Sequence, residues 1–307
     1  MPDDQPNQKY LVDHLFRTRD VHLIAGPSRA GKTTLALQIL DSWSRGEAVF
    51  ERPSHPLPAV YMACDRPAES LREHMECLDM DPEAHPHDSM ADHTAEGERT
   101  VDKALGIARK TLPKMRVLFL DGFETLCAGR ITEHRDVTKF MLTTAALCRK
   151  ENITIIGCVP AVKSKENERY SAPQDRTLGS VAWMKLSDMA ILIEPVAPKN
   201  PEDANRIVTL LPHRGATRSF AYAFDGPRLV RRAEVTLLPP MDAWLQNAPR
   251  QTPIPAKQLV EAGQALGIVR WKLYEWIKTQ VDLGTMTRTD YGEYQIVGPV
   301  GGETAPN

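Results

Sequence analysis

The sequence predicts an α/β fold in which a mostly parallel, twisted sheet carries helices on both faces. Short apolar runs alternate along the chain with segments whose apolar residues recur at helical spacing. Strands and helices in this alternation form parallel strands joined by right-handed crossovers. A glycine-rich stretch at residues 26–33 joins the first clear strand to the first clear helix, and strand-like runs without long helices follow residue 188. These late runs predict hairpins that extend one edge of the sheet.

The glycine-rich stretch fits the P-loop pattern G-x-x-x-x-G-K-[ST] and lies between an apolar run, 21–25, and a helical segment, 34–43. In that setting the loop amides and the helix N-terminus face phosphates, Lys32 reaches the β- and γ-phosphates, and the Thr33 hydroxyl is a ligand for Mg²⁺. The sequence therefore predicts binding of ATP with Mg²⁺. The predicted nucleotide-binding residues are Gly26, Pro27, Ser28, Arg29, Ala30, Gly31, Lys32, Thr33 and Thr34.

Further elements follow in the same alternation. Periodicity predicts strands at 59–63, 117–121, 153–159, 190–194, 206–211 and 220–224, a helix from Pro67, and helices around 101–108 and 137–145. Residues 79–97 are polar and are predicted to form a surface loop. Several histidines and aspartates in this loop could in principle bind a transition metal, but they are interpreted as ordinary surface residues. They are His85, His87, Asp88, Asp92 and His93. The core is predicted to end near Val235.

Two carboxylates follow predicted strands downstream of the P-loop. Asp121 closes a buried strand, where P-loop enzymes place the carboxylate that holds Mg²⁺ opposite the loop hydroxyl of Thr33. Asp65 follows the preceding strand and could orient or deprotonate the attacking water. An N-cap of the helix that starts at Pro67 is the alternative role for Asp65. With Lys32, these two residues are the predicted catalytic set in this part of the chain.

Four segments carry a family resemblance: residues 21–26, 34–38, 60–67 and 118–121. Together they resemble the RecA-fold ATPases of the RepA type, the hexameric replicative helicases of plasmids and phages, over about residues 10–235. The resemblance implies a RecA-like P-loop ATPase core that translocates on DNA. Two departures stand out. Asp65 occupies a position where the family has Glu, and Val159-Pro160 replace polar residues that sense the γ-phosphate.

Residues 212–217 resemble a basic turn that, in the related DnaB-type helicases, sends an arginine into the ATP site of the neighbouring subunit. The resemblance makes Arg214 a candidate arginine finger in trans, with an ordinary surface-turn arginine as the alternative. A finger in trans requires head-to-tail contacts that close into a ring or continue as a filament. The expected assembly is a homo-oligomer, and the family resemblance implies a hexamer.

Two loops are candidates for contact with single-stranded DNA. The first, 129–135, carries Arg130. The second, 163–176, combines cations with one aromatic residue, as a strand-tracking loop does; the cations taken as DNA contacts are Lys163, Lys165, Arg169 and Arg176. Acidic residues within the second loop leave a solvated loop as the alternative, and the fold analogy favours DNA.

The C-terminal part is predicted to be a separate unit. Residues 236–252 are a proline-rich linker, 253–298 follow the order helix, turn, helix and wing, and 299–307 form a flexible tail. The middle segment resembles a winged-helix domain, with Arg270 and Lys272 as candidate DNA contacts. Acids match the cations of this segment in number, so duplex DNA binding and protein docking both remain open. Trp271 and Trp276 are predicted to pack in its core.

Composition narrows the class of protein. The 307 residues are 42% apolar and 25% charged with a net charge of −2, so any DNA binding must come from local patches. Five cysteines without a C-x-x-C pair argue against a disulfide framework or a zinc site, and no run of eighteen apolar residues occurs. We therefore expect a cytoplasmic ATPase without a membrane partner, acting as a DNA helicase or translocase. An ATP-switched DNA-binding regulator and a recombinase-like filament protein are the alternatives.

Overall fold

The computed structural model describes residues 9–95, 98–161, 182–195, 204–213, 217–232, 252–265, 270–282, 284–290 and 292–297, together with Leu245 and Ala248. The described residues up to 232 form one compact unit, and those from 245 onward form a second. No helix in these ranges is both long and apolar enough to cross a membrane.

A large sheet organises the first unit. Within the described residues it has nine strands in the order β11-β10-β9-β8-β3-β7-β6-β4-β5. Neighbours from β8 to β5 run parallel, and β9, β10 and β11 are antiparallel additions beyond β8. The strands are β3 Val21–Gly26, β4 Ala59–Ala63, β5 His87–Ser89, β6 Val117–Asp121, β7 Thr154–Pro160, β8 Met189–Pro195, β9 Asn205–Pro212, β10 Arg218–Asp225 and β11 Arg228–Arg231. The predicted α/β fold, with a mostly parallel sheet and an antiparallel edge, is confirmed.

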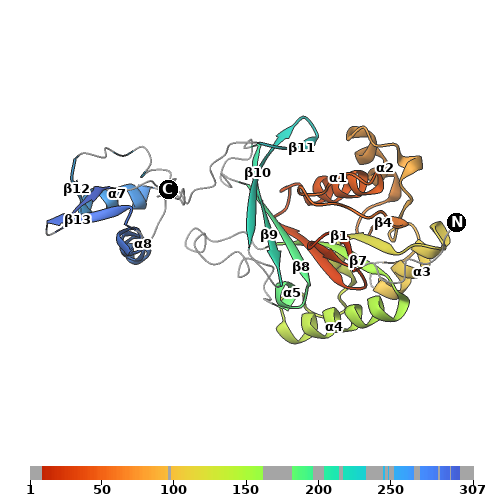
Figure 1. Cartoon of the computed structure of the whole chain (residues 1–307). Helices are drawn as coiled ribbons and strands as arrows, with labels where there is room; N and C mark the ends of the chain where they lie inside the picture. The colour runs from red at the N-terminus through yellow and green to blue at the C-terminus, as the bar shows by residue number, and fades with distance from the viewer. Residues whose placement is uncertain are drawn as a thin grey trace. The chain divides into compact units, whose positions relative to one another are not determined.

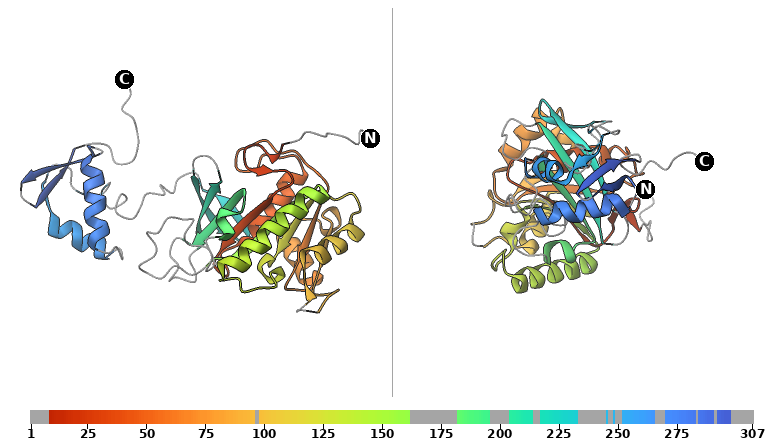
Figure 2. Two further views of the ribbon diagram at one scale, coloured as in Figure 1. Left: turned by 90° about the horizontal axis from the view of Figure 1, so that it is seen from below. Right: turned by 90° about the vertical axis from the view of Figure 1, so that its left-hand side faces the viewer.

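Helices cover both faces of this sheet (Figure 1). The helices α1 and α2 lie on one face, and α3, α4 and the short α5 lie on the other; Figure 2 shows α3 and α4 across that second face in its left-hand view. Successive residues of β3, Leu23 and Ile24, belong to the two opposite cores, which is why this strand is apolar throughout. The helices are α1 Lys32–Ser44, α2 Ala68–Cys77, α3 Val101–Thr111, α4 His134–Glu151 and α5 Ala182–Lys185.

The antiparallel edge brings late parts of the chain back to the P-loop. Strand β9 starts beside the C-terminal end of β8 and ends beside its start, because Arg206 pairs with Pro195 and Pro212 with Met189. The last strand of the unit, β11, is tied to helix α1: the Gln38 side chain donates to the Leu229 carbonyl at 3.1 Å and accepts from the Leu229 N–H at 3.0 Å.

The polar segment 79–97 differs from its prediction as a loop. It contains a short 3-10 helix, η1 Pro82–Ala84, and the edge strand β5, whose His87 is in register with Tyr61 of β4. The strand was missed because it is short and polar, so it has neither apolar alternation nor a buried run. A hairpin of β1 Tyr10–Val12 and β2 Phe16–Arg17 was also not predicted.

The second unit has its own core. Its described elements follow the predicted order of two helices and a hairpin, preceded by a short strand that pairs with the hairpin: β12 Ile254–Pro255, α7 Ala256–Ala265, α8 Arg270–Asp282, β13 Met286–Asp290 and β14 Glu293–Ile296. Leu259, Leu273, Ile277 and Met286 are among its buried residues, and Trp276 packs against them as predicted. The side chain of Trp271 lies outside the described residues.

Candidate active site

The loop between β3 and α1 follows a path that side chains would block at its two glycines. A Cβ on Gly26 would lie 2.4 Å from the Ile193 carbonyl oxygen, and one on Gly31 would lie 2.7 Å from Cζ of Phe224. Gly31 also has φ 104°, in the left-handed region that glycine tolerates best. The loop is therefore held closely against β8 and β10, and the N-terminus of α1 opens directly after it.

Lys32 lies over this loop. Its ammonium donates to the carbonyls of Gly26 at 3.0 Å and Pro27 at 3.1 Å. These bonds keep the cation at the mouth of the loop, where the motif requires it to meet phosphates. An incoming triphosphate would offer the ammonium charged acceptors in place of the neutral carbonyls.

Thr33 and Asp121 form the pair that the sequence predicted for Mg²⁺. The Thr33 hydroxyl donates to Asp121 Oδ2 at 2.8 Å, and the carboxylate is buried at the end of β6. A hydroxyl and a carboxylate at this separation are the hard oxygen donors that Mg²⁺ prefers, so the residues present fit the ion. When bound, Mg²⁺ would neutralise charge on the phosphate oxygens.

Asp65 lies close to this pair because β4 and β6 are neighbours. Ala63 is in register with Asp121, and the Cys64 N–H donates to the Asp121 carbonyl at 2.8 Å. The Asp65 carboxyl rests against Gly122, where a Cβ would lie 3.2 Å from Asp65 Cγ. The side chain reaches solvent, yet desolvation by nearby protein atoms raises its pKa, and the charge of Asp121 adds to the rise.

The N-cap role considered for Asp65 is wrong. Helix α2 begins after Pro67, and the first N–H of the helix, at Ala68, donates to Asp92 Oδ2 at 2.9 Å. Asp92 comes from the turn after β5, which the sequence did not connect to this helix. Asp65 is therefore left facing the P-loop side of the site.

Arg66 is a site residue that the sequence reading missed. Its Nη2 donates to Asp121 Oδ2 at 2.8 Å, so this one oxygen accepts from both Arg66 and Thr33. The Arg66 Nε is buried and has no hydrogen-bond partner among the described residues. A cation directly after Asp65, at the carboxyl end of a strand, was the available signal.

Glu124 is a third carboxyl in the site, and it was also missed. It lies on the 3-10 helix η3 Phe123–Leu126, three positions after Asp121, and its Oε2 is buried without a hydrogen-bond partner among the described residues. Burial raises the pKa of Glu124 to about 7, the charge of Asp65 adds to the rise, and the Lys32 ammonium opposes it.

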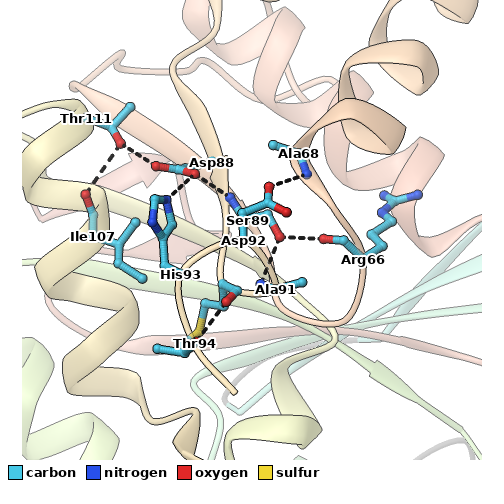
Figure 3. Close-up of polar contacts among 11 residues, drawn as sticks. Arg66, Ala68, Asp88, Ser89, Ala91, Asp92, His93, Thr94, Ile107 and Thr111 are labelled. Carbon is cyan, nitrogen blue, oxygen red and sulfur yellow. Dashed lines mark hydrogen bonds and ion pairs between the residues drawn. The ribbon is translucent and has the colours of Figure 1, made fainter. Parts of the chain in front are cut away.

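The turn after β5 supports the loop that carries Asp65 and Arg66 (Figure 3). The Ser89 hydroxyl donates to the Arg66 carbonyl, and Asp92 accepts from Ala68. Asp88 in turn accepts from His93 at 2.9 Å and from Thr111 of α3 at 3.2 Å. The polar cluster of 85–93 therefore braces the active-site loop, and no group of three or more metal-type side chains gathers within the described ranges.

Comparison with known proteins agrees with this geometry. A family model described as an AAA domain matches residues 2–162, more than half of the chain. The chain belongs to this AAA-domain family. Its structure is similar to a KaiC-like protein from the hyperthermophilic archaeon Pyrococcus horikoshii OT3, with a TM-score of 0.50 and 17% identity over 72% of this chain and 93% of that one. No curated protein matches the chain in sequence.

The AAA-domain match and the fold together identify the core as that of a P-loop ATPase of the RecA type. Within this AAA-domain protein, Arg130 is exposed after η3, and its N–H donates to Asp136 Oδ2 at 2.9 Å. The remaining predicted contacts are not placed: the side chains of Lys163, Lys165, Arg169, Arg176, Arg214, Arg270 and Lys272 all lie outside the described residues.

Proposed function

We propose that this ATPase is an oligomeric DNA helicase or translocase that serves the replication of a mobile element such as a plasmid or phage. The observation that carries the enzymatic part is the convergence of Lys32, the Thr33–Asp121 pair and Asp65 at one edge of the sheet. The DNA part rests on the resemblance of the segments around this site to the RepA-type helicases.

The arrangement supports hydrolysis of the γ-phosphate. Lys32 and the N-terminus of α1 would bind the phosphate oxygens. Asp65 would orient a water that attacks the γ-phosphorus, and it would take the proton of that water while the β–γ bridging oxygen leaves with ADP. The raised pKa of Asp65 makes its carboxylate a better proton acceptor than an ordinary aspartate.

The topology supports an arginine finger in trans. Strand β9 ends at Pro212, which lies beside Met189 and hence next to His22 at the start of β3. That edge is about 13 Å along the sheet from Gly26, where the P-loop begins. Arg214 follows this end of β9 in the sequence, and its own position lies outside the described residues. A neighbouring subunit packed head to tail would bring its Arg214 to this P-loop.

The test is ATP hydrolysis by the full chain with and without single-stranded DNA, followed by unwinding of a forked duplex. We expect DNA to stimulate hydrolysis and ATP to drive unwinding, and Lys32→Ala should abolish both. If DNA does not change the rate of hydrolysis and the protein does not unwind the fork, the helicase proposal is rejected. The assignment as an ATPase would still stand.

Two observations favour a second function. Asp65 is shorter than the Glu of the RepA-type helicases, and Arg66 pairs with the Asp121 carboxylate that Mg²⁺ needs. Both suit a slow ATP-switched DNA-binding regulator. Such a protein would bind DNA differently with ATP and with ADP and would not unwind. Electron micrographs distinguish the third possibility, a recombinase-like protein, because it would form filaments rather than closed rings.

A further inference from the structure

We propose that Arg66 is a mobile arginine that competes with Mg²⁺ for Asp121 and then pairs with the triphosphate of the same chain. The inference rests on the proposed ATP site and goes beyond it, because it assigns a role to a residue outside the predicted set. Under this proposal, Mg²⁺ binding releases the side chain that recognises the γ-phosphate, so the two steps are coupled.

The competition follows from a shared oxygen. Thr33 and Arg66 both donate to Asp121 Oδ2, each at 2.8 Å. Mg²⁺ bound at the Thr33 hydroxyl would use the lone pairs of this carboxylate, either directly or through a bound water. A guanidinium cannot keep its hydrogen bond to the same oxygen there, since the two cations repel one another at close range. We therefore expect the Arg66 side chain to leave this oxygen when Mg²⁺ binds.

The main chain of Arg66 is held while its side chain can move. Ser89 fixes the Arg66 carbonyl, Pro67 follows with φ −62°, and Asp92 holds the next N–H, at Ala68. Figure 3 shows the Arg66 side chain extending away from the Ser89 and Asp92 contacts. About a quarter of this side chain is exposed, and its Nε makes no hydrogen bond with the described residues. The side chain can therefore change rotamer while its main chain stays fixed.

The Arg66 guanidinium lies near the part of the site where phosphates are expected to bind. His74 of α2 hydrogen-bonds with Thr34, in the first turn of α1, at 3.2 Å. Thr33, also in that first turn, donates to the same Asp121 oxygen as Arg66, so the guanidinium lies close to the start of α1. The first turn of α1 is where the motif places phosphates. A triphosphate bound at that turn would offer the released guanidinium a new anion.

Charge in the site favours the exchange. Three carboxyl side chains belong to the site, Asp65, Asp121 and Glu124, and Asp121 is the one that Arg66 neutralises. Mg²⁺ would take over that neutralisation and free the arginine for the triphosphate. ADP lacks the third phosphate, so the released guanidinium gains less from it. Arg66 would then increase the preference of the Mg²⁺-loaded site for ATP over ADP.

Titrations with fluorescent nucleotides test this directly in the full chain. Binding of a non-hydrolysable mant-ATP analogue and of mant-ADP is measured across a Mg²⁺ series for the wild type, Arg66→Ala and Arg66→Gln. Without the competing guanidinium, half-saturating Mg²⁺ should fall several-fold. The preference for triphosphate over diphosphate should fall about tenfold, the value of one charge-assisted hydrogen bond. Arg66→Gln keeps most of the side-chain length and should behave like Arg66→Ala.

Arg72→Ala is the matched control, because Arg72 lies on the neighbouring helix α2 and pairs with Glu76 and Glu83 away from the P-loop. It should reproduce the wild-type titrations. An unchanged Mg²⁺ requirement, or an unchanged preference for triphosphate, in variants that melt like the wild type would overturn the proposal. Wild-type protein that binds Mg²⁺ and nucleotide as expected but shows no DNA-stimulated hydrolysis would reject the helicase function and leave the role of Arg66 standing.

Discussion

The Nε of Arg206 donates a 3.0 Å hydrogen bond to the main-chain carbonyl of Ala30, inside the phosphate-binding loop. Arg206 is buried at the start of β9, and its guanidinium lies 4.9 Å from the centre of the Phe224 ring. That ring in turn lies against the Gly31 position. The antiparallel edge of the sheet therefore braces the loop that the parallel part creates.

Removing this brace should weaken nucleotide binding. Arg206→Ala deletes the bond to Ala30 and the stacking on Phe224, so we expect the dissociation constant for a fluorescent ATP analogue to rise about tenfold. Arg232→Ala removes an exposed arginine of the same edge and should bind like the wild type. An unchanged affinity in a folded Arg206→Ala protein would mean that the loop keeps its shape without the brace.

Glu124 should make folding stability depend on pH. Its folded pKa of about 7 exceeds its ordinary value of 4.5, so the folded state holds the proton more tightly than the unfolded chain. The stabilising contribution of that proton is complete below pH 4.5 and is lost as the pH rises through about 7. Glu124→Gln keeps a neutral side chain at every pH and escapes the loss.

We therefore expect Glu124→Gln to melt close to the wild type near pH 4.5 and a few degrees higher at pH 8. Thermal denaturation across this range, without nucleotide, is the measurement. Glu133→Gln, an exposed glutamate just before α4, provides the control and should show no such trend. A difference between Glu124→Gln and wild type that is the same at pH 4.5 and pH 8 would refute the assignment.

Mixed assemblies should reveal whether Arg214 acts across an interface. Arg214→Ala and Lys32→Ala should each be inactive in hydrolysis. Mixing them should restore part of the activity, because one subunit supplies the arginine and its neighbour supplies an intact P-loop. Labelled subunits must first be shown to exchange. If exchange occurs and no activity returns, catalysis does not use Arg214 in trans.

If the C-terminal unit binds duplex DNA, the start of α8 should make the contacts. Replacing both Arg270 and Lys272 with Ala should weaken binding and flatten its salt dependence by about one unit per lost phosphate contact. Fluorescence anisotropy on the full chain across a salt series measures both. Hydrolysis stimulated by single-stranded DNA should survive the double change. Salt dependence that does not alter would assign this unit to protein docking.

Local patterns made the fold largely predictable. Residues 26–33 and their flanking strand and helix form a continuous segment, and buried parallel strands such as β6 read as unbroken apolar runs. The edge strand β5 could not be predicted from a local pattern, because its three residues are polar. It is held by pairing with β4 and by the hydrogen bonds of Ser89 and Asp88. Its role becomes visible only once the sheet is assembled.

The site was predictable where a motif fixes both residue and spacing, as for Lys32 and Thr33. Asp121 could be assigned because it closes a buried apolar strand downstream of the P-loop. Arg66 and Arg206 could not, since the meaning of each depends on a partner far away in sequence, Asp121 and Ala30. A buried arginine in a strand, such as Arg206, does not by itself indicate a role in the site. Its role can be recognised only when the structure shows that it donates to the Ala30 carbonyl.

Two hydrogen bonds between Gln38 and Leu229 connect helix α1 directly to strand β11. Its first turn carries Lys32 and Thr33, and its middle grips the last described strand of the ATPase unit, just before the chain runs on toward the C-terminal unit. A helix is stiff, so a tilt produced at the phosphate end must either be followed by β11 or break both bonds. A tilt of α1 on nucleotide binding would therefore reach β11 directly through these two bonds, without passing through the rest of the sheet.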